Sequence, residues 1–319
     1  MAFYSPDGSL HQRLTALVQR LAGERGDGLA SGLSITWLQY PGSLLAQAQE
    51  GYEVSAWRAV AGVGSASQAR GAAWQGSRLR DPGDLVRLPY LIACERWLQR
   101  GLLEDEPELR RALLAMIRQG SHDATSYVVD RLSGTTSGPA LAAPGREAWT
   151  AQRLLVNRWL ISLGWPELEG CQAAQKTWQD GPYGREREFC GADQENGNRF
   201  SSDGLARLFE GVLAGTLISP PACRRMGTLL AVPESEGVAD AYSPLGLASL
   251  LPPAGAGWQG FWGLGGRGSV STLVALYGEG EGLPPTLLVV LAEPRPDYGP
   301  DGLVAAVVAE LFGALAWSA

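Results

Sequence analysis

The sequence predicts an α/β fold of the α+β type, in which a mostly antiparallel sheet is covered by an N-terminal and a C-terminal helix and interrupted by an all-helical lobe. Three observations predict it. Apolar positions recur at helical spacing near both ends, in residues 10–21 and 303–317. Short apolar runs follow the first of these segments and precede the last one. Between them lie several helical patterns, many of them closed by glycine.

The order helix, strands, helices, strands, helix has a consequence for domain organisation. Neither terminal segment holds enough short strands for a stable sheet alone, so both must contribute to one sheet. We therefore expect residues 1–80 and 235–319 to form an α/β sheet subdomain, and residues 81–234 to form a helical subdomain. A cleft between the two is where a ligand site would form.

Individual elements follow from periodicity and from breaker residues. Strands are expected at 33–38, 52–63, 259–264, 270–277 and 286–292. Helices of the inserted lobe are expected at 84–100, 108–119, 124–132, 146–163, 202–217 and 220–230, with an irregular stretch at 165–199. Pro89 lies a few residues inside the first of these helices and is expected to distort it.

Composition excludes several classes of function. The formal net charge is −7 and Lys and Arg form no long cluster, which disfavours a nucleic-acid or an anionic-membrane partner. No apolar run is long enough for a membrane span, and the N-terminus lacks the pattern of a secretory signal, so the cytoplasm is the expected location. The spacing of Cys94, Cys171, Cys190 and Cys223 fits no zinc or redox motif. We therefore expect reduced thiols, no metal and no cofactor.

Three short segments carry a resemblance to a known family. Residues 81–88, 120–126 and 261–266 resemble the S-x-x-K, S-D-N and K-T-G elements of the serine β-lactamases and penicillin-binding proteins, which are serine hydrolases. The resemblance runs from about Leu33 to Ala292 and is nearest to an uncharacterised cyanobacterial branch of class A-like proteins. The strings that carry this closer likeness are residues 123–126, 135–139, 162–169, 175–178 and 181–187.

The resemblance places unusual residues at the reactive positions. The family reaction needs a serine nucleophile and, one helical turn later, a neutral lysine as its base. Those positions hold Asp84 and Arg87, and Leu264 stands where the K-T-G lysine would favour an anionic substrate. A guanidinium cannot act as a base near neutral pH. Ser121 keeps the family residue type, and Asp123 lies beside it.

Two functions remain open at this point. The first is a catalytically inactive member that serves as a binding or structural protein, with an unidentified small molecule or protein as its partner. The second is a hydrolase of β-lactam-like, amide or ester substrates that uses an unrecognised nucleophile, with Ser65 and Ser67 as the serines to check.

The degenerate positions also have purely structural interpretations. Asp84 and Arg87 are spaced for an ion pair at a helix N-terminus, as an alternative to contacting a ligand. Ser121 is placed to cap the helix that follows it, as an alternative to being a remnant of a site. Glu167 and Glu169 are expected in a solvated loop.

Two groups of residues could line a binding surface. Lys176, Trp178, Tyr183 and Arg185 belong to the densest polar and aromatic cluster of the chain, which either holds the irregular stretch together or lines a pocket. Trp262 should point to the same side of its strand as Leu264, and that side faces either the cleft or the core.

Overall fold

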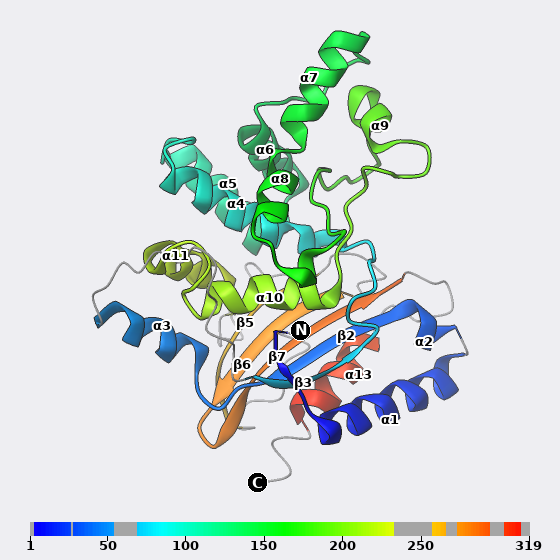
Figure 1. The fold of residues 1–319 in the computed structure, drawn as a ribbon, viewed down its shortest axis with the longest axis vertical. Helices are drawn as coiled ribbons and strands as arrows, with labels where there is room; N and C mark the ends of the chain where they lie inside the picture. The colour runs from blue at the N-terminus through cyan, green and yellow to red at the C-terminus, as the bar shows by residue number, and fades with distance from the viewer. Residues whose placement is uncertain are drawn as a thin grey trace.

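The two ends of the chain build one sheet, as the sequence predicts. The computed structural model describes residues 3–26, 28–53, 69–232, 257–265, 273–293 and 303–313. Within these ranges, strands from both ends form a seven-stranded sheet in the order β1-β3-β2-β7-β6-β5-β4. All neighbouring strands are antiparallel except β1 and β3. The predicted fold class is confirmed (Figure 1).

The strands join early and late parts of the sequence at the centre of the sheet. Leu33 of β2 lies opposite Ala292 of β7 and Gln39 lies opposite Thr286, and all residues of this paired stretch are buried on both strands. The strands are β1 (Ser5–Pro6), β2 (Leu33–Gln39), β3 (Arg70–Trp74), β4 (Ala231–Val232), β5 (Trp258–Gly265), β6 (Leu273–Gly280) and β7 (Leu283–Ala292).

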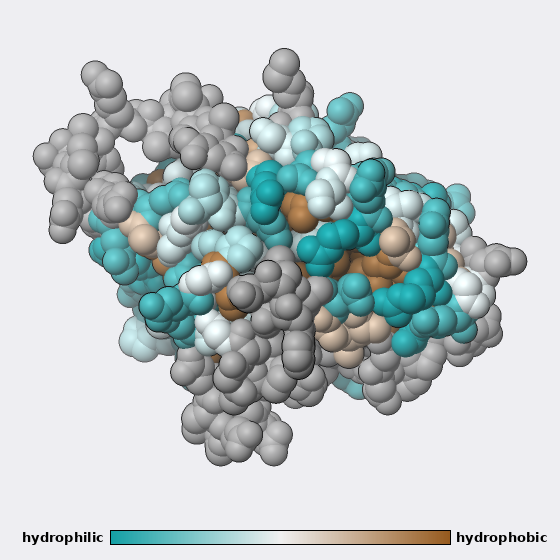
Figure 2. All heavy atoms as spheres, turned by 90° about the horizontal axis from the view of Figure 1, so that it is seen from below, coloured by the Kyte–Doolittle hydropathy of each residue, from teal (hydrophilic) through white to brown (hydrophobic). Residues whose placement is uncertain are grey.

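One face of the sheet is covered by the terminal helices. Helices α1 (Gly8–Arg25) and α13 (Leu303–Val308) bury their apolar sides in one core with strand residues such as Trp37 and Val290. A single π-helical turn, Ala309–Gly313, continues α13. On the side of the molecule that carries α1 and α13, the coloured part of the surface is mainly hydrophilic, with hydrophobic areas between polar residues (Figure 2). The predicted covering of one face by both helices is confirmed.

The other face carries the helical part of the chain. Its helices are α3 (Leu44–Glu53), α4 (Arg87–Gln99), α5 (Pro107–Arg118), α6 (His122–Ser133), α7 (Ala143–Arg153), α8 (Leu155–Ser162), α9 (Gly184–Cys190), α10 (Ser202–Leu213) and α11 (Pro220–Leu230), and a short α2 (Leu29–Gly32) precedes β2. Helix α10 lies between the sheet and the upper helices (Figure 1) and packs on β2, β7 and α4. Because it joins both parts, the boundaries proposed for the subdomains stay a prediction. None of the helices in the described ranges combines the length and apolar character needed to cross a bilayer.

Several sequence-based expectations were wrong in detail. Tyr52 and Glu53, expected in a strand, end helix α3, and the rest of that predicted strand, 54–68, lies outside the described residues. Strand β3 was missed because its small residues give little β-strand signal. The helix expected at 146–163 is divided at Leu154 into α7 and α8. The irregular stretch contains α9 and a 3₁₀ turn, Pro166–Leu168.

The expected distortion at Pro89 takes the form of a change of helix type. Gly83–Val86 form a 3₁₀ helix, η1, and the α-helix begins only at Arg87. Proline has no N–H to donate to the residue four positions earlier, so it is tolerated in the first turn of an α-helix and not deeper. Pro89 therefore helps to determine where α4 begins.

A buried polar contact ties α10 to the sheet. The hydroxyl of Thr36 on β2 donates to Oδ1 of Asp203 on α10 over 2.7 Å. The backbone N–H of Asp203 donates to the carbonyl of Gly76, just after β3. Burial raises the pKa of the Asp203 carboxyl, so this hydroxyl is an important partner for a poorly solvated group.

Replacing Thr36 by valine keeps the shape of the side chain and removes the donor. Because Asp203 then loses its hydrogen bond, we expect Thr36→Val to lower the free energy of unfolding by about 1–3 kcal/mol in urea titrations. Thr136→Val, at an exposed position, is the matched control and should change it by less than about 0.5 kcal/mol. Equal effects of the two substitutions would show that the contact does not stabilise the fold.

Candidate functional site

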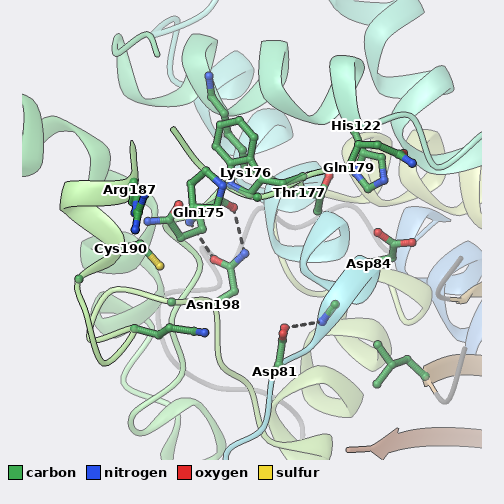
Figure 3. A pocket seen from close by; sticks show the side chains of 18 of the residues that line it. Asp81, Asp84, His122, Gln175, Lys176, Thr177, Gln179, Arg187, Cys190 and Asn198 are labelled. Atoms are coloured by element: carbon green, nitrogen blue, oxygen red, sulfur yellow. Dashed lines mark hydrogen bonds between the residues drawn. The ribbon is translucent and has the colours of Figure 1, made fainter. Parts of the chain in front are cut away.

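A cleft of about 770 Å³ opens where the start of the helical part meets the sheet. Its walls come from η1, the first residue of α6, the start of β6 and the long segment 175–198. Among the lining residues are Asp81, Asp84, His122, Gln175, Lys176, Thr177, Trp178, Gln179, Arg187, Cys190, Asn198 and Leu273, most of which are labelled in Figure 3. The cleft therefore brings together Asp84, Lys176 and Trp178 of the residues predicted for the site.

Asp84 and Arg87 form an ion pair beneath this cleft. Nη2 of Arg87 lies 2.8 Å from Oδ1 of Asp84, and Arg87 is fully buried while the Asp84 side chain is 10% exposed. The same guanidinium donates to the Gly120 carbonyl over 2.7 Å and to the Thr125 hydroxyl over 3.1 Å. Arg87 thus joins the start of α4 to the start of α6, the two segments that resemble S-x-x-K and S-D-N.

Residues 121–123 are placed differently from one another. Ser121 Oγ accepts a hydrogen bond from the Ala124 N–H over 3.1 Å, so this side chain caps α6 as the helix-cap interpretation expects. Asp123 is exposed and does not line the cleft. His122, between them, does line the cleft, although it was not among the residues predicted for the site.

Leu264 and Trp262 lie on one side of β5, as strand alternation predicts, and that side faces the core. Leu264 is 1% exposed and belongs to the hydrophobic core between the sheet and the helical part of the chain. Phe261 belongs to the core on the opposite face of the sheet, which α1 and α13 cover. Trp262 packs against Tyr277 with ring centroids 5.8 Å apart. The segments η1 and β5 are in contact, so the third element lies near the first, but neither Trp262 nor Leu264 lines the cleft.

Lys176 belongs to a buried cluster of four charges behind the cleft wall. Its Nζ lies 2.8 Å from Asp130 and 3.5 Å from Glu186. Arg153 lies 2.6 Å from Glu186 and 3.5 Å from Asp130. Two cations and two carboxylates therefore balance, and the Lys176 charge is largely neutralised within the protein. Burial raises the pKa of the Asp130 carboxyl.

Asn198 holds the segment that forms the cleft wall. Its Oδ1 accepts from the N–H groups of Ala174 and Gln175 over 3.0 and 2.8 Å, and its Nδ2 donates to the Gln175 carbonyl over 3.0 Å. The Tyr90 hydroxyl donates to that same carbonyl. Figure 3 shows this bracing of Gln175 by Asn198. The sequence contained no local signal for it, because the partners lie far apart in the chain.

Several buried polar atoms of the cleft residues have no hydrogen-bond partner within the described part of the chain. They are Nδ1 of His122, both amide atoms of Gln175, Oγ1 of Thr177 and Nε1 of Trp178. A buried polar group without a partner costs about 1–3 kcal/mol. These five atoms belong to four cleft residues, and a ligand in the cleft would reach them only if the side chains moved.

The remaining predicted residues lie outside the cleft or at its rim. Tyr183 is exposed and donates to Asp180, and Arg185 donates to the Pro139 carbonyl; neither lines the cleft. Arg187 does line it, and among the described residues it has no acidic partner within ion-pair distance. Ser65 and Ser67 lie outside the described residues.

Neither a reactive thiol nor a metal site is found in the described part of the cleft. Burial, with the nearby Glu195 and Asp81 carboxylates, raises the pKa of the Cys190 thiol, so the thiolate is disfavoured. No group of three or more His, Cys, Asp or Glu side chains within the described ranges is arranged to hold a metal ion. Glu167 and Glu169 do not line the cleft either.

Comparisons with solved structures show which class of protein has this fold. A β-lactamase from Sphaerobacter thermophilus is similar over 98% of both chains, with 14% identity and a TM-score of 0.60. A PBP-A mutant solved as an acyl-enzyme complex with penicillin G is similar over 98% of both chains, with 13% identity and a TM-score of 0.57. The chain therefore has the fold of the serine β-lactamases and penicillin-binding proteins.

The likeness extends to the class A β-lactamases in particular. A variant of the last common ancestor of the class A β-lactamases of Gram-negative bacteria matches 96% of this chain and 97% of its own, with 15% identity and a TM-score of 0.56. No protein-family model matches the sequence, and no curated protein matches it. At these identities the likeness is one of fold, so function must be argued from the site.

The burial of Leu264 can be tested by introducing a charge. Because an ammonium group would have to be desolvated in the core, we expect Leu264→Lys to lower the free energy of unfolding by about 3 kcal/mol or more. Leu264→Met conserves volume and should cost less than about 1.5 kcal/mol. Chemical denaturation measures both. A lysine tolerated as well as methionine would mean that position 264 faces an open cleft.

Proposed function

We propose that this protein is a catalytically inactive relative of the serine β-lactamases and penicillin-binding proteins, and that it acts as a non-covalent binding protein through the cleft. The observation that carries the proposal is the buried ion pair of Asp84 and Arg87. It stands at the two positions that the sequence resemblance assigns to the nucleophile and its base.

The chemistry of this pair opposes acyl transfer. A carboxylate held against a guanidinium is a weak nucleophile, and its acyl product would be a labile anhydride. The guanidinium keeps its proton near neutral pH, so no base is present to activate an attacking group at this position. The three contacts of Arg87 with Asp84, Gly120 and Thr125 instead give the residue a structural role.

The environment of the cleft supports the same conclusion. Where a lysine would attract an anionic substrate, Leu264 lies in the core. Of the two cations that line the described part of the cleft, Lys176 is compensated by Asp130 and Glu186, and only Arg187 lacks an acidic partner among the described residues. Electrostatic stabilisation of a developing negative charge, usually the largest catalytic contribution, is therefore weakened at this site.

Binding is supported by what the cleft retains. It keeps the volume of a small-molecule site, and its walls combine Trp178 with the polar residues Gln175 and Thr177. Arg187 adds one cation without an acidic partner among the described residues. We expect this arrangement to bind a polar ligand that accepts and donates hydrogen bonds. The ligand would not be cleaved.

The state of the cysteines supports a cytoplasmic location as part of this proposal. All four cysteines are free thiols, and three of them are buried. Free thiols persist most readily in a reducing compartment.

Acylation is the direct test of the proposed inactivity. Because the aligned nucleophile is Asp84 and the aligned base is Arg87, we expect no mass increase after incubation with penicillin G or a fluorophosphonate probe. Intact-mass spectrometry measures the adduct, and an active class A β-lactamase treated in parallel with the fluorophosphonate and a slow-reacting β-lactam serves as the positive control. Stoichiometric labelling of Ser65, Ser67 or Ser121 would instead favour a hydrolase with a different nucleophile.

A further inference from the structure

A second cavity lies at the other end of α4. It has a volume of about 610 Å³ and opens where the end of α4, helix α8 and helix α10 come together. Residues of these helices and of the turns beside them line it: Arg96, Trp97, Arg100, Leu102, Leu155, Arg158, Trp159, Ser162, Leu163, Trp165, Arg207, Gly211, Thr216 and Leu217. None of the described residues lines both this cavity and the cleft. Since α4 rises about 1.5 Å per residue, its two ends are about 20 Å apart.

The charged side chains that line the described part of this cavity are all positive. Among the described residues four arginines line it and no acidic residue does, although the whole chain has a net charge of −7. Arg207 is paired with Glu210 over 3.2 Å, and Arg96 donates to the Gln99 amide over 2.7 Å. Arg100 and Arg158 are exposed and have no ion-pair partner in the described part of the chain. Burial, and then the neighbouring Arg100, lowers the pKa of Arg96.

The walls between these cations are aromatic and apolar. Trp97 and Trp159 meet edge to face with ring centroids 5.9 Å apart, and the Arg207 guanidinium lies 4.8 Å above the ring of Trp165. Trp159 and Trp165 are partly exposed, and Leu102 is 62% exposed. A planar apolar group therefore finds ring surfaces within reach of guanidinium groups.

A purely structural explanation accounts for only part of this arrangement. Cations near the end of α4 are stabilised by the partial negative charge of the helix C-terminus, which explains Arg96 and Arg100. Arg207 of α10 is held by Glu210 and by the ring of Trp165, but neither the helix C-terminus nor an ion pair in the described part of the chain explains Arg158 of α8. Like charges gathered around one cavity repel each other, and a bound anion would relieve that repulsion.

We propose that this cavity binds a small organic anion that has a planar aromatic body and at least one phosphate, sulfonate or carboxylate group. The aromatic body lies against Trp159 and Trp165, and the anionic groups contact Arg100 and Arg158. Guanidinium groups recognise such oxyanions through paired hydrogen bonds. The volume is that of a small-molecule site, which favours a small ligand over a folded partner.

The test uses naphthalene-1,5-disulfonate as the probe, with binding measured by calorimetry and by the change in tryptophan fluorescence. We expect saturable binding to the full-length protein, weakened at high ionic strength because exposed charges are screened. Methanesulfonate lacks the ring, and 2-naphthalenemethanol lacks the charge. Each should bind at least about tenfold more weakly than the probe, because each keeps either the contacts with the arginines or those with the tryptophan rings, but not both.

Variants locate the site. The double variant Arg100→Gln/Arg158→Gln removes two exposed cations and should weaken probe binding by about tenfold or more. Arg146→Gln, an exposed arginine on α7 away from both cavities, is the matched control and should leave the affinity unchanged. Circular dichroism of each variant verifies the fold.

Three outcomes would overturn the proposal. They are no saturable binding of the probe, equal binding by the double variant and the wild-type protein, and loss of binding in Arg187→Gln alone. The last result would place the anion in the cleft. None of these outcomes bears on whether the cleft is catalytically inactive, because acylation is measured independently.

Discussion

The buried guanidinium of Arg87 is the constraint on which the site depends. A fully buried charge is tolerated only when it is paired and hydrogen-bonded, and Arg87 meets that requirement through Asp84, Gly120 and Thr125. These contacts fix the start of α4 against the start of α6 and so form the floor of the cleft. An arginine at position 87 thus requires an acid nearby, which gives a physical reason for Asp84 and Arg87 to occur together.

The same reasoning applies to the wall of the cleft. Lys176 lines the cleft, yet Asp130 and Glu186 compensate its charge, and Arg153 completes a balanced cluster. Asn198 then holds the backbone beside Gln175. Charges that could act on a substrate are here used to stabilise a long segment with little regular structure. The cleft keeps its volume and polar lining, while the groups suited to chemistry are engaged in the scaffold.

The overall fold could be predicted from the sequence because periodicity and glycine stops are local signals. They correctly indicated β2, β5, β7 and most helices, and a cap of α6 was one of the two roles that the sequence left open for Ser121. Strand β3 and the break at Leu154 were missed, since neither carries a distinct local pattern. Alternation on β5 correctly placed Trp262 and Leu264 on one side, but only the packed structure shows that this side faces the core.

The site was less predictable because its partners are distant in sequence. Lys176 was predicted for the site because it lies in the densest polar and aromatic cluster of the chain. Its ion-pair partners Asp130 and Glu186 could not be predicted from the sequence. The second cavity gathers residues such as Arg100, Arg158 and Arg207 from three parts of the chain, and no segment alone indicates it. Such sites follow from tertiary packing, which local patterns do not specify.

A double-mutant cycle on Asp84 and Arg87 tests most directly whether their pair is structural. The free energy of unfolding would be measured for Asp84→Asn, for Arg87→Met and for the double variant. Because each single change leaves one partner of a buried pair uncompensated, we expect a coupling energy of about 2 kcal/mol, with the double variant less destabilised than the sum of the two single changes. A coupling energy below about 0.5 kcal/mol would contradict a structural ion pair and reopen the question of what Asp84 does in the cleft.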